Sequence, residues 1–231
     1  MTTDSYPFKF VGTGGVFDYK YGNSSLIIDV PQKILIDIGP LVYPRLAETG
    51  AIEGVEYLLL THLHGDHIGG IFQYIFHNKG KLGKVSKILF QNEIFRNEIS
   101  ALLDAMSIPK THYEFVPVSE LQNIECIDTT GKHAENVTSF GFVFHLNKET
   151  IYYSGDLGDI EVSNQVLRRL QPENTIVLHE VHHKGGKAHV NYRELEELSN
   201  NFKMFGYHCN PDLIPKDNKI PLASNYPEII L

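Results

Sequence analysis

The sequence has none of the features that mark a membrane-spanning, secreted or disulfide-stapled protein. No stretch approaches the roughly 18 apolar residues of a membrane span, and residues 1–5 supply neither the basic region nor the apolar core of a signal peptide. The two cysteines, Cys126 and Cys209, are too few for a disulfide framework and lack CxxC spacing, so we expect both to be reduced. These absences predict a cytoplasmic protein that binds no membrane.

Positive charge is also scarce. The chain holds 20 Lys and Arg against 28 Asp and Glu, which gives a formal net charge of -8, and it contains no basic block. A protein that binds long nucleic acid or an anionic membrane needs a positive face to gather phosphate groups. A short anionic ligand can be held by metal ions instead. We therefore expect a small substrate and no long nucleic acid.

The most informative stretch runs from Thr61 to Gly70 and reads THLHGDHIGG. An apolar run before it, Leu58–Leu60, predicts a buried strand, and the residues after it predict the start of a helix. Imidazoles and carboxylates bind divalent cations, and an Asp beside a His can serve two adjacent ions. A His-rich surface loop, the alternative, fits the HxHxDH spacing poorly. The candidate ligands of this loop are His62, His64, Asp66 and His67.

Strands are predicted to cluster, and helices to follow them, in both halves of the chain. This pattern predicts an α/β fold with two packed sheets and helices outside, in one domain over residues 1–231. The proline-containing tail, 211–231, is expected to wrap the surface or a partner subunit. Predicted strands cover 8–11, 25–29, 33–37, 58–60, 87–90, 113–118, 124–127, 139–146, 150–153, 175–180 and a segment ending near 208; predicted helices cover 71–77, 92–106, 161–170 and 192–201.

Later loops offer further candidates for the metal site. His133 lies in a loop between strands, Asp156 follows an apolar strand in a Ser-Gly-Asp turn, and His208 ends a strand. Asp37 ends an earlier strand, where its carboxylate either orients a ligand histidine or caps the strand end. Cys209 is expected to be a small buried residue, with a role near the metal as the alternative.

Other segments leave their roles open. Residues 12–15 lack the full GxGxxG pattern and the Lys-Ser/Thr of a phosphate-binding loop, which favours a tight inter-strand loop over a nucleotide cradle. The locally basic segment His182–Lys187 either closes over a substrate phosphate or base or is a solvated linker. The remaining histidines are expected to be structural or exposed: His77, His112, His145 and His179.

The sequence resembles the metallo-β-lactamase superfamily, in particular its ribonuclease Z-like and cyclic-nucleotide phosphodiesterase branch. The resemblance implies a four-layer αββα sandwich with the site at one edge of the sheets. It covers nearly the whole chain and is carried by Gly12–Gly15, Asn23–Ser25, Asp37–Gly39, the HxHxDH loop, His133, Ser154–Asp156, His179–Glu180, Lys187–His189 and His208.

Carried over position by position, the resemblance implies two divalent metal ions. His-rich ligation favours zinc, with manganese or iron as alternatives. One ion would be held by His62, His64 and His133, the second by Asp66, His67 and His208, and Asp156 would bridge both.

The resemblance also implies catalytic roles for three side chains. Two adjacent divalent ions lower the pKa of a water and neutralise phosphoryl oxygens, and Asp66 would hold and orient that water. The leaving oxygen needs a proton. His189 matches the extra histidine of this branch as its donor, and Glu180 could hold His189 in the acidic tautomer. A surface histidine before a helix and a capped strand end are the alternatives for these two residues.

Within the branch, the compact length, the GTGGVFD start and the His-Glu…Ala-His pairing look most like the phage and bacterial anti-Pycsar phosphodiesterases. These hydrolyse cCMP and cUMP, and often cAMP and cGMP, to linear monophosphates and so counteract anti-phage signalling. The resemblance implies a homodimer in the cytosol of a bacterium or phage-infected host.

The 23 positions from His133 to Asp156 already hold a strand pair, which leaves no room for the tRNA-gripping arm of ribonuclease Z. The alternatives are ribonuclease Z-like RNA processing, a metal-dependent lactonase or thioesterase, and non-catalytic nucleotide sequestration.

Overall fold

The computed structural model of the chain describes residues 6–29 and 31–231. Over this range the chain divides into two compact units. Unit 1 contains the described parts of 1–12, 22–120 and 227–231, and unit 2 contains 13–21 and 121–226. The prediction of one domain over 1–231 stays a prediction. The absence of a leader was inferred from residues 1–5, which lie outside the described range; within that range no helix has the length and apolar character needed to cross a bilayer.

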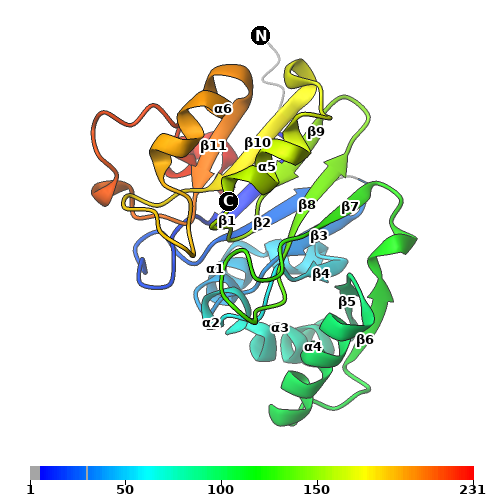
Figure 1. Ribbon diagram of the computed structural model, residues 1–231. Coiled ribbons are helices and arrows are strands. Elements are labelled where there is room, and N and C mark those ends of the chain that lie inside the picture. The colour runs from blue at the N-terminus through cyan, green and yellow to red at the C-terminus, as the bar shows by residue number, and fades with distance from the viewer. Residues whose placement is uncertain (1–5, 30) are drawn as a thin grey trace. The chain divides into compact units, whose positions relative to one another are not determined.

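Unit 1 is built on a six-stranded sheet whose strands follow the order of the chain (Figure 1). The first three strands pair antiparallel, and β3 to β6 run parallel. Parallel neighbours need crossover connections, which here contain α1, α3 and α4. The elements are β1 (Phe8–Gly12), β2 (Ser25–Asp29), β3 (Lys33–Ile36), α1 (Val42–Thr49), β4 (Tyr57–Leu59), α2 (Gly65–Ile68), α3 (Ile71–Lys81), β5 (Ser86–Phe90), α4 (Glu93–Ala105) and β6 (Tyr113–Pro117).

The sequence pattern of unit 1 explains these elements. The central strands are apolar runs such as Ile34–Ile36, which are fully buried, as parallel strands commonly are. Helix α4 buries Phe95, Ile99 and Leu103, which lie four positions apart and therefore share one face. Asn92 caps the start of this helix by accepting a hydrogen bond from the backbone of Phe95.

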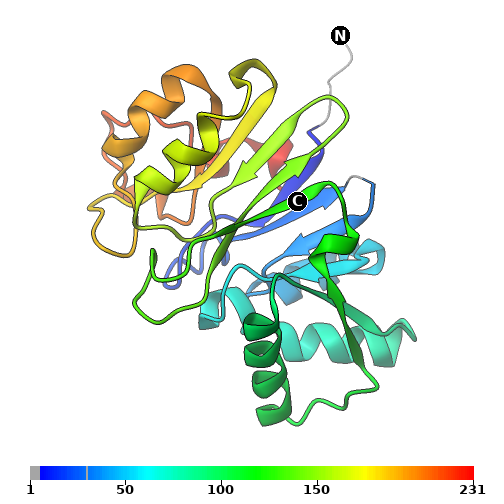
Figure 2. The same cartoon turned by 45° about the vertical axis from the view of Figure 1, so that its right-hand side comes forward.

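Unit 2 is built on a five-stranded sheet in the order β11-β10-β9-β8-β7. The first three strands of this unit pair antiparallel, whereas β9, β10 and β11 run parallel. Figure 2 shows α5 and α6 on the same face of this sheet. The elements are β7 (Ile124–Asp128), β8 (Phe140–His145), β9 (Thr150–Tyr153), α5 (Ile160–Leu167), β10 (Thr175–Glu180), α6 (Glu196–Asn201) and β11 (Lys203–Tyr207).

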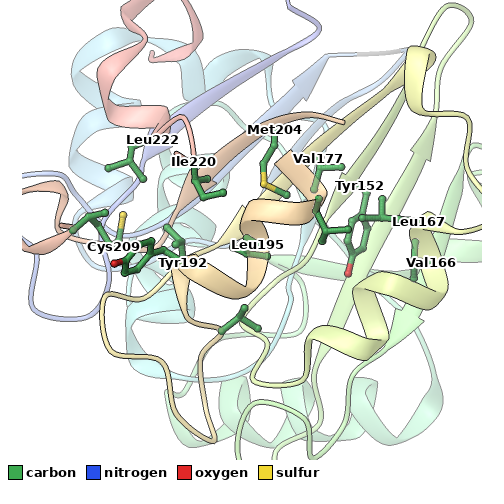
Figure 3. Close-up of a cluster of buried hydrophobic side chains, with 14 of the residues drawn as sticks. Tyr152, Val166, Leu167, Val177, Tyr192, Leu195, Met204, Cys209, Ile220 and Leu222 are labelled. Atoms are coloured by element: carbon green, nitrogen blue, oxygen red, sulfur yellow. The ribbon is translucent and has the colours of Figure 1, made fainter. Parts of the chain in front are cut away.

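A cluster of buried apolar side chains joins the two helices of unit 2 to its sheet (Figure 3). Leu167 of α5 and Leu195, just before α6, point toward Tyr152, Val177 and Met204 from three neighbouring strands. All of these side chains are at most 4% exposed. One face of the sheet is therefore covered by the two helices. The polar side chains of the site lie on the loops at the strand ends.

Four helices differ from the sequence-based predictions, and one of them is α5, which ends at Leu167 instead of 170. Helix α3 continues to Lys81 instead of ending at 77, because Asn78 is buried and donates from Nδ2 to Ser86 Oγ at 2.9 Å. The helix predicted over 192–201 is a 3-10 turn, Tyr192–Leu195, followed by α6. Helix α1 was not predicted, and it contains Pro44 in its first turn, where a missing N–H is tolerated.

The tail over 211–231 contains no α-helix. It forms 3-10 turns over Pro211–Leu213, Ala223–Asn225 and Pro227–Ile229. In unit 2 the backbone of Gly206 donates to Pro221 O at 2.7 Å, and in unit 1 the backbone of Leu231 donates to Phe10 O at 2.9 Å. The tail therefore contacts each unit through backbone hydrogen bonds, and its apolar side chains Ile220 and Ile229 are buried.

Candidate metal centre

The HxHxDH loop lies in unit 1 and runs from the carboxyl end of β4 into α2, which contains Asp66 and His67. The ring centroid of His62 is 4.5 Å from that of His64 and 4.2 Å from that of His67. Asp66 Oδ2 lies 3.5 Å from His67 Nε2. The backbone fixes the loop, since Ile38 N donates to His67 O at 2.6 Å. The four predicted donors of this loop therefore share one small volume.

Asp37 follows β3 directly and contacts this loop. Its Oδ2 accepts hydrogen bonds from His67 Nδ1 at 2.7 Å and from Thr61 Oγ1 at 2.8 Å, and its Oδ1 accepts one from Thr61 N at 2.8 Å. Burial raises the pKa of Asp37, although the His67 and Thr61 contacts oppose that shift. A histidine that donates from Nδ1 keeps the lone pair of Nε2 for a metal. Of the two roles predicted for Asp37, the geometry favours orientation of a ligand histidine.

The backbone from Asp37 to Gly39 is shaped to receive the loop. Asp37 has φ of 60°, in the left-handed region that few residues other than glycine adopt and in which Asp and Asn are enriched. A Cβ atom at Gly39 would overlap the backbone oxygen of Asp66. Gly39 is therefore required for the close approach of the two segments, and a side chain there would displace a predicted ligand.

We expect Asp37→Asn to weaken divalent-metal binding about 10- to 100-fold. Asparagine keeps the size of the side chain and tolerates the left-handed backbone, but its amide replaces one accepting oxygen with a donor. Titration against a chromogenic chelator measures the affinity. Asp29→Asn, the same change at an exposed strand end, is the matched control. Equal affinity in the two variants would contradict the orienting role.

Unit 2 presents its predicted site residues on loops that follow strand ends. Asp156 follows β9, Glu180 is the last residue of β10, and His208 follows β11. Because these three strands are parallel neighbours, their carboxyl ends meet at one edge of the sheet. His133 lies on the loop from β7 to β8. Asp156 Oδ2 lies 3.2 Å from His208 Nε2 and 3.7 Å from His133 Nε2.

Neighbouring groups orient the donors of unit 2. His133 Nδ1 lies 2.8 Å from Ala188 O, so Nδ1 carries the proton and Nε2 offers its lone pair. Tyr207 donates to Gly155 O at 3.1 Å and so holds the turn that carries Asp156. Two imidazoles and a carboxylate, with one imidazole oriented through its other nitrogen, are a donor set that suits divalent metal ions.

His189 and Glu180 form a hydrogen-bonded pair beside these donors. Glu180 Oε2 lies 3.2 Å from His189 Nδ1, and its Oε1 accepts from Val190 N at 2.7 Å. Burial raises the pKa of Glu180 to about 7, against the opposing effect of His189. The His189 ring centroid is 4.9 Å from that of His133 and 5.4 Å from that of His208. The structure thus pairs His189 with Glu180 as the resemblance implied.

Two supporting residues were not identified from the sequence. Thr61 contacts Asp37 and lies with its Oγ1 3.0 Å from His62 Nδ1, so it links two site residues. Its position directly before the first histidine was the available signal. Tyr207, stacked on Tyr153 with ring centroids 4.8 Å apart, had no local signal because its partner lies in a distant part of the sequence.

The cysteines and the remaining histidines lie outside these donor sets. Burial raises the pKa of Cys209 to about 12, which keeps it a thiol, in keeping with its expected role as a small buried residue. His145 is exposed, and His77 lies 3.2 Å from the hydroxyl of Tyr43. His179 is buried, with Nε2 2.8 Å from Ser163 Oγ and Nδ1 2.6 Å from Glu180 O.

Buried His179 makes the metal-free protein sensitive to acid. Burial lowers its pKa from 6.5 to about 4, so the unfolded chain takes up the proton first, and stability is lost as the pH falls from about 6.5 toward 4. We expect this group to cost about 2 kcal/mol of unfolding free energy between about pH 7 and pH 5. Urea unfolding at both pH values, with chelator present, should show a smaller loss in His179→Gln than in the wild type. Equal losses would contradict the linkage.

Comparison with solved structures identifies the fold of the chain. The chain is similar to the metallo-β-lactamase fold protein YhfI of Bacillus subtilis, at 17% identity and a TM-score of 0.68, over 87% of this chain and 85% of that one. It is also similar to a diphosphatase of the PhnP family, at 18% identity and a TM-score of 0.64, over 87% and 86% of the two chains. The α/β fold is that of the metallo-β-lactamase proteins, as the sequence predicted.

Sequence comparison then identifies the family. A sequence model of the anti-Pycsar protein Apyc1 family matches residues 6–222, and the chain belongs to that family. It is 28% identical over 225 residues to the anti-Pycsar protein Apyc1 of Saccharibacillus brassicae, covering 88% of this chain and 90% of that protein. With the histidine and carboxylate donors of both units, this membership supports the binding of divalent metal.

Proposed function

We propose that this protein is a metal-dependent phosphodiesterase that hydrolyses cyclic mononucleotides to linear nucleoside monophosphates and so counteracts Pycsar-type signalling. The substrates are cCMP and cUMP, and also cAMP and cGMP. The observation that carries the proposal is the His189–Glu180 pair beside the donors of unit 2, in a chain of the Apyc1 family. A proton donor held next to a metal-ligand set is what cleavage of an alkyl phosphodiester requires.

The proposed metal centre uses the ligands that the resemblance implies. When bound, two adjacent divalent ions, zinc or else manganese or iron, would lower the pKa of a water and neutralise phosphoryl oxygens. The hydrogen bonds of His67 to Asp37 and of His133 to Ala188 support this assignment, because each leaves Nε2 as the donor atom. The proposed ligands are His62, His64 and His133 for one ion, Asp66, His67 and His208 for the other, and Asp156 shared between them.

The side chains have separate roles in the proposed reaction. Asp66 accepts a hydrogen bond from the attacking water and orients it toward phosphorus. As the bond from phosphorus to the ribose oxygen breaks, His189 gives that oxygen a proton, so that an alcohol leaves instead of an alkoxide. Glu180, whose Oε2 accepts a hydrogen bond from Nδ1–H of His189, stabilises the charged ring before the transfer.

The proposed partner is a small cyclic nucleotide, and long RNA is not a proposed substrate. Strands β8 and β9 fall between His133 and Asp156, so this interval supplies no arm for gripping RNA. The net charge of -8 supports the same choice, because long RNA needs several cationic contacts. We further propose a cytoplasmic homodimer.

A substrate panel with metal analysis of the same sample tests the proposal. Metal-loaded protein is incubated with the four cyclic mononucleotides, bis(p-nitrophenyl) phosphate, a precursor tRNA, an acyl-lactone and a thioester. We expect turnover of the cyclic nucleotides and the chromogenic diester. Turnover of the lactone or thioester alone would overturn the proposal, and tight binding of cyclic nucleotides without turnover would indicate sequestration.

A further inference from the structure

A cavity of about 320 Å³ opens within unit 2 beside His189 and His208. Its walls come from the loop over residues 13–21, the loop after β10 and the segment after β11, which can be followed by colour in Figure 1. This volume is at the lower end of the range of small-molecule sites. The proposed reaction uses His189 and His208 in its wall but assigns no role to the other lining residues.

His182 lies in the wall of this cavity and has a fixed tautomer. Its Nδ1 accepts hydrogen bonds from the backbone of Lys184 at 3.2 Å and of Gly185 at 3.1 Å. An imidazole nitrogen that accepts carries no proton, so the proton of neutral His182 is on Nε2. Burial also lowers the pKa of His182, which keeps the ring neutral at physiological pH. His182 is therefore a hydrogen-bond donor through Nε2.

The loop that carries His182 is held in place. The backbone of His182 donates to Val190 O at 2.9 Å and accepts from Tyr192 N at 3.1 Å. Asn191 Nδ2 donates to His183 O at 3.2 Å. The His182 ring stacks on that of His189, with centroids 5.6 Å apart and planes inclined by 26°. These contacts argue against a solvated linker, whereas closure of the segment over a substrate stays a prediction.

The same cavity holds an acceptor and an apolar surface. Asp18 lines it, and its Oδ2 accepts a hydrogen bond from Gly15 N at 3.1 Å, which leaves further acceptor capacity on the carboxylate. Val16, Phe17 and Leu213 also line it and are 55%, 88% and 56% exposed. A fixed donor, a carboxylate acceptor and exposed apolar surface are the components of a site for a planar heterocycle.

We propose that His182 and Asp18 form the nucleobase site of this protein. His182 Nε2–H donates to a ring nitrogen or carbonyl oxygen of the base, and the Asp18 carboxylate accepts from a neighbouring amino or imino N–H. This inference rests on the proposed function and deepens it. Each of the four bases carries a donor beside an acceptor on its edge, so one pair of residues can serve several cyclic nucleotides.

The variant His182→Asn separates binding of the base from support of the loop. The amide oxygen of asparagine can accept the same two backbone N–H groups in an Asx-type turn, but its side chain is too short to place a donor where Nε2 lies. We expect KM for cCMP and cAMP to rise about 3- to 10-fold, as loss of one hydrogen bond predicts, with kcat nearly unchanged. KM for bis(p-nitrophenyl) phosphate, which has no base, should rise less than KM for the two cyclic nucleotides.

Calorimetric titration with CMP and with ribose 5-phosphate completes the test, with His145→Asn, an exposed histidine of the same unit, as the control. We expect His182→Asn to weaken the binding of CMP alone. Unchanged KM and CMP affinity would overturn the base site, and equal losses on substrates with and without a base would reduce His182 to a positioning residue. Failure of the wild type to hydrolyse any cyclic nucleotide would overturn the proposed function, whereas selective loss of CMP binding in the variant would still support the base site.

Discussion

Replacing Asp156 by alanine is expected to lower the hydrolysis of cCMP at least about a thousandfold. Asp156 is 3% exposed and lies within 3.7 Å of both His133 and His208, so its loss removes the proposed shared ligand and leaves two histidines without their carboxylate partner. Steady-state turnover of metal-loaded protein, with the bound metal measured on the same sample, checks this outcome.

The control for Asp156→Ala is a second substitution of Asp by Ala, at a position with no proposed role in catalysis or metal binding. Asp217, which pairs with Arg193 at 3.1 Å on the exposed surface of unit 2, is replaced by alanine. Surface pairs of this kind contribute about 1 kcal/mol or less, so activity and metal content should equal those of the wild type. Full cCMP turnover in Asp156→Ala would remove this residue from the metal centre.

His189→Ala is expected to slow cyclic-nucleotide hydrolysis about 100- to 10,000-fold, the range typical of a lost general acid. The loss should depend on the leaving group. A ribose oxygen needs the proton that His189 supplies, whereas p-nitrophenolate is stable as an anion at neutral pH and needs none. We therefore expect bis(p-nitrophenyl) phosphate to lose less than about tenfold in the same variant.

Glu180→Gln extends this test to the partner of His189. Glu180 accepts from both His189 Nδ1 and Val190 N, and an amide can accept at only one of its two terminal atoms. The variant should show the same dependence on leaving group with a smaller loss. If both substrates slowed equally in His189→Ala, the residue would act in metal or substrate binding and not as a proton donor.

Local spacing explains which parts of the site could be predicted from the sequence. The HxHxDH loop was evident because its four donors lie within six positions after an apolar strand. The role of Asp37 could not be decided, since the hydrogen bond to His67 joins residues 30 positions apart. The role of His182 could not be predicted either. Its two hydrogen bonds from the backbone of Lys184 and Gly185 are local, but the cavity that it lines is formed by three separate segments.

The fold, like the site, was predictable where the signal is local in the sequence. Apolar runs located the strands of both sheets, because strands such as Leu58–Leu60 differ clearly from their polar flanks. Helix α1 was missed because Pro44 suggests a break, although proline is compatible with a first turn. The extension of α3 depends on the contact of Asn78 with Ser86 across a turn, which no periodicity indicates.

The parallel order of β9, β10 and β11 has a consequence for folding. Asp156 and His208, which follow β9 and β11, lie 52 positions apart along the chain, and parallel pairing of distant segments forms slowly. An unfolded or partly folded chain has no assembled donor set in this unit. Metal bound there would therefore stabilise the folded state over the unfolded and partly folded states. Metal at about 100 times its dissociation constant would add about 2.7 kcal/mol to stability. The metal supply of the cell would therefore govern how long the folded protein persists, as well as how fast it works.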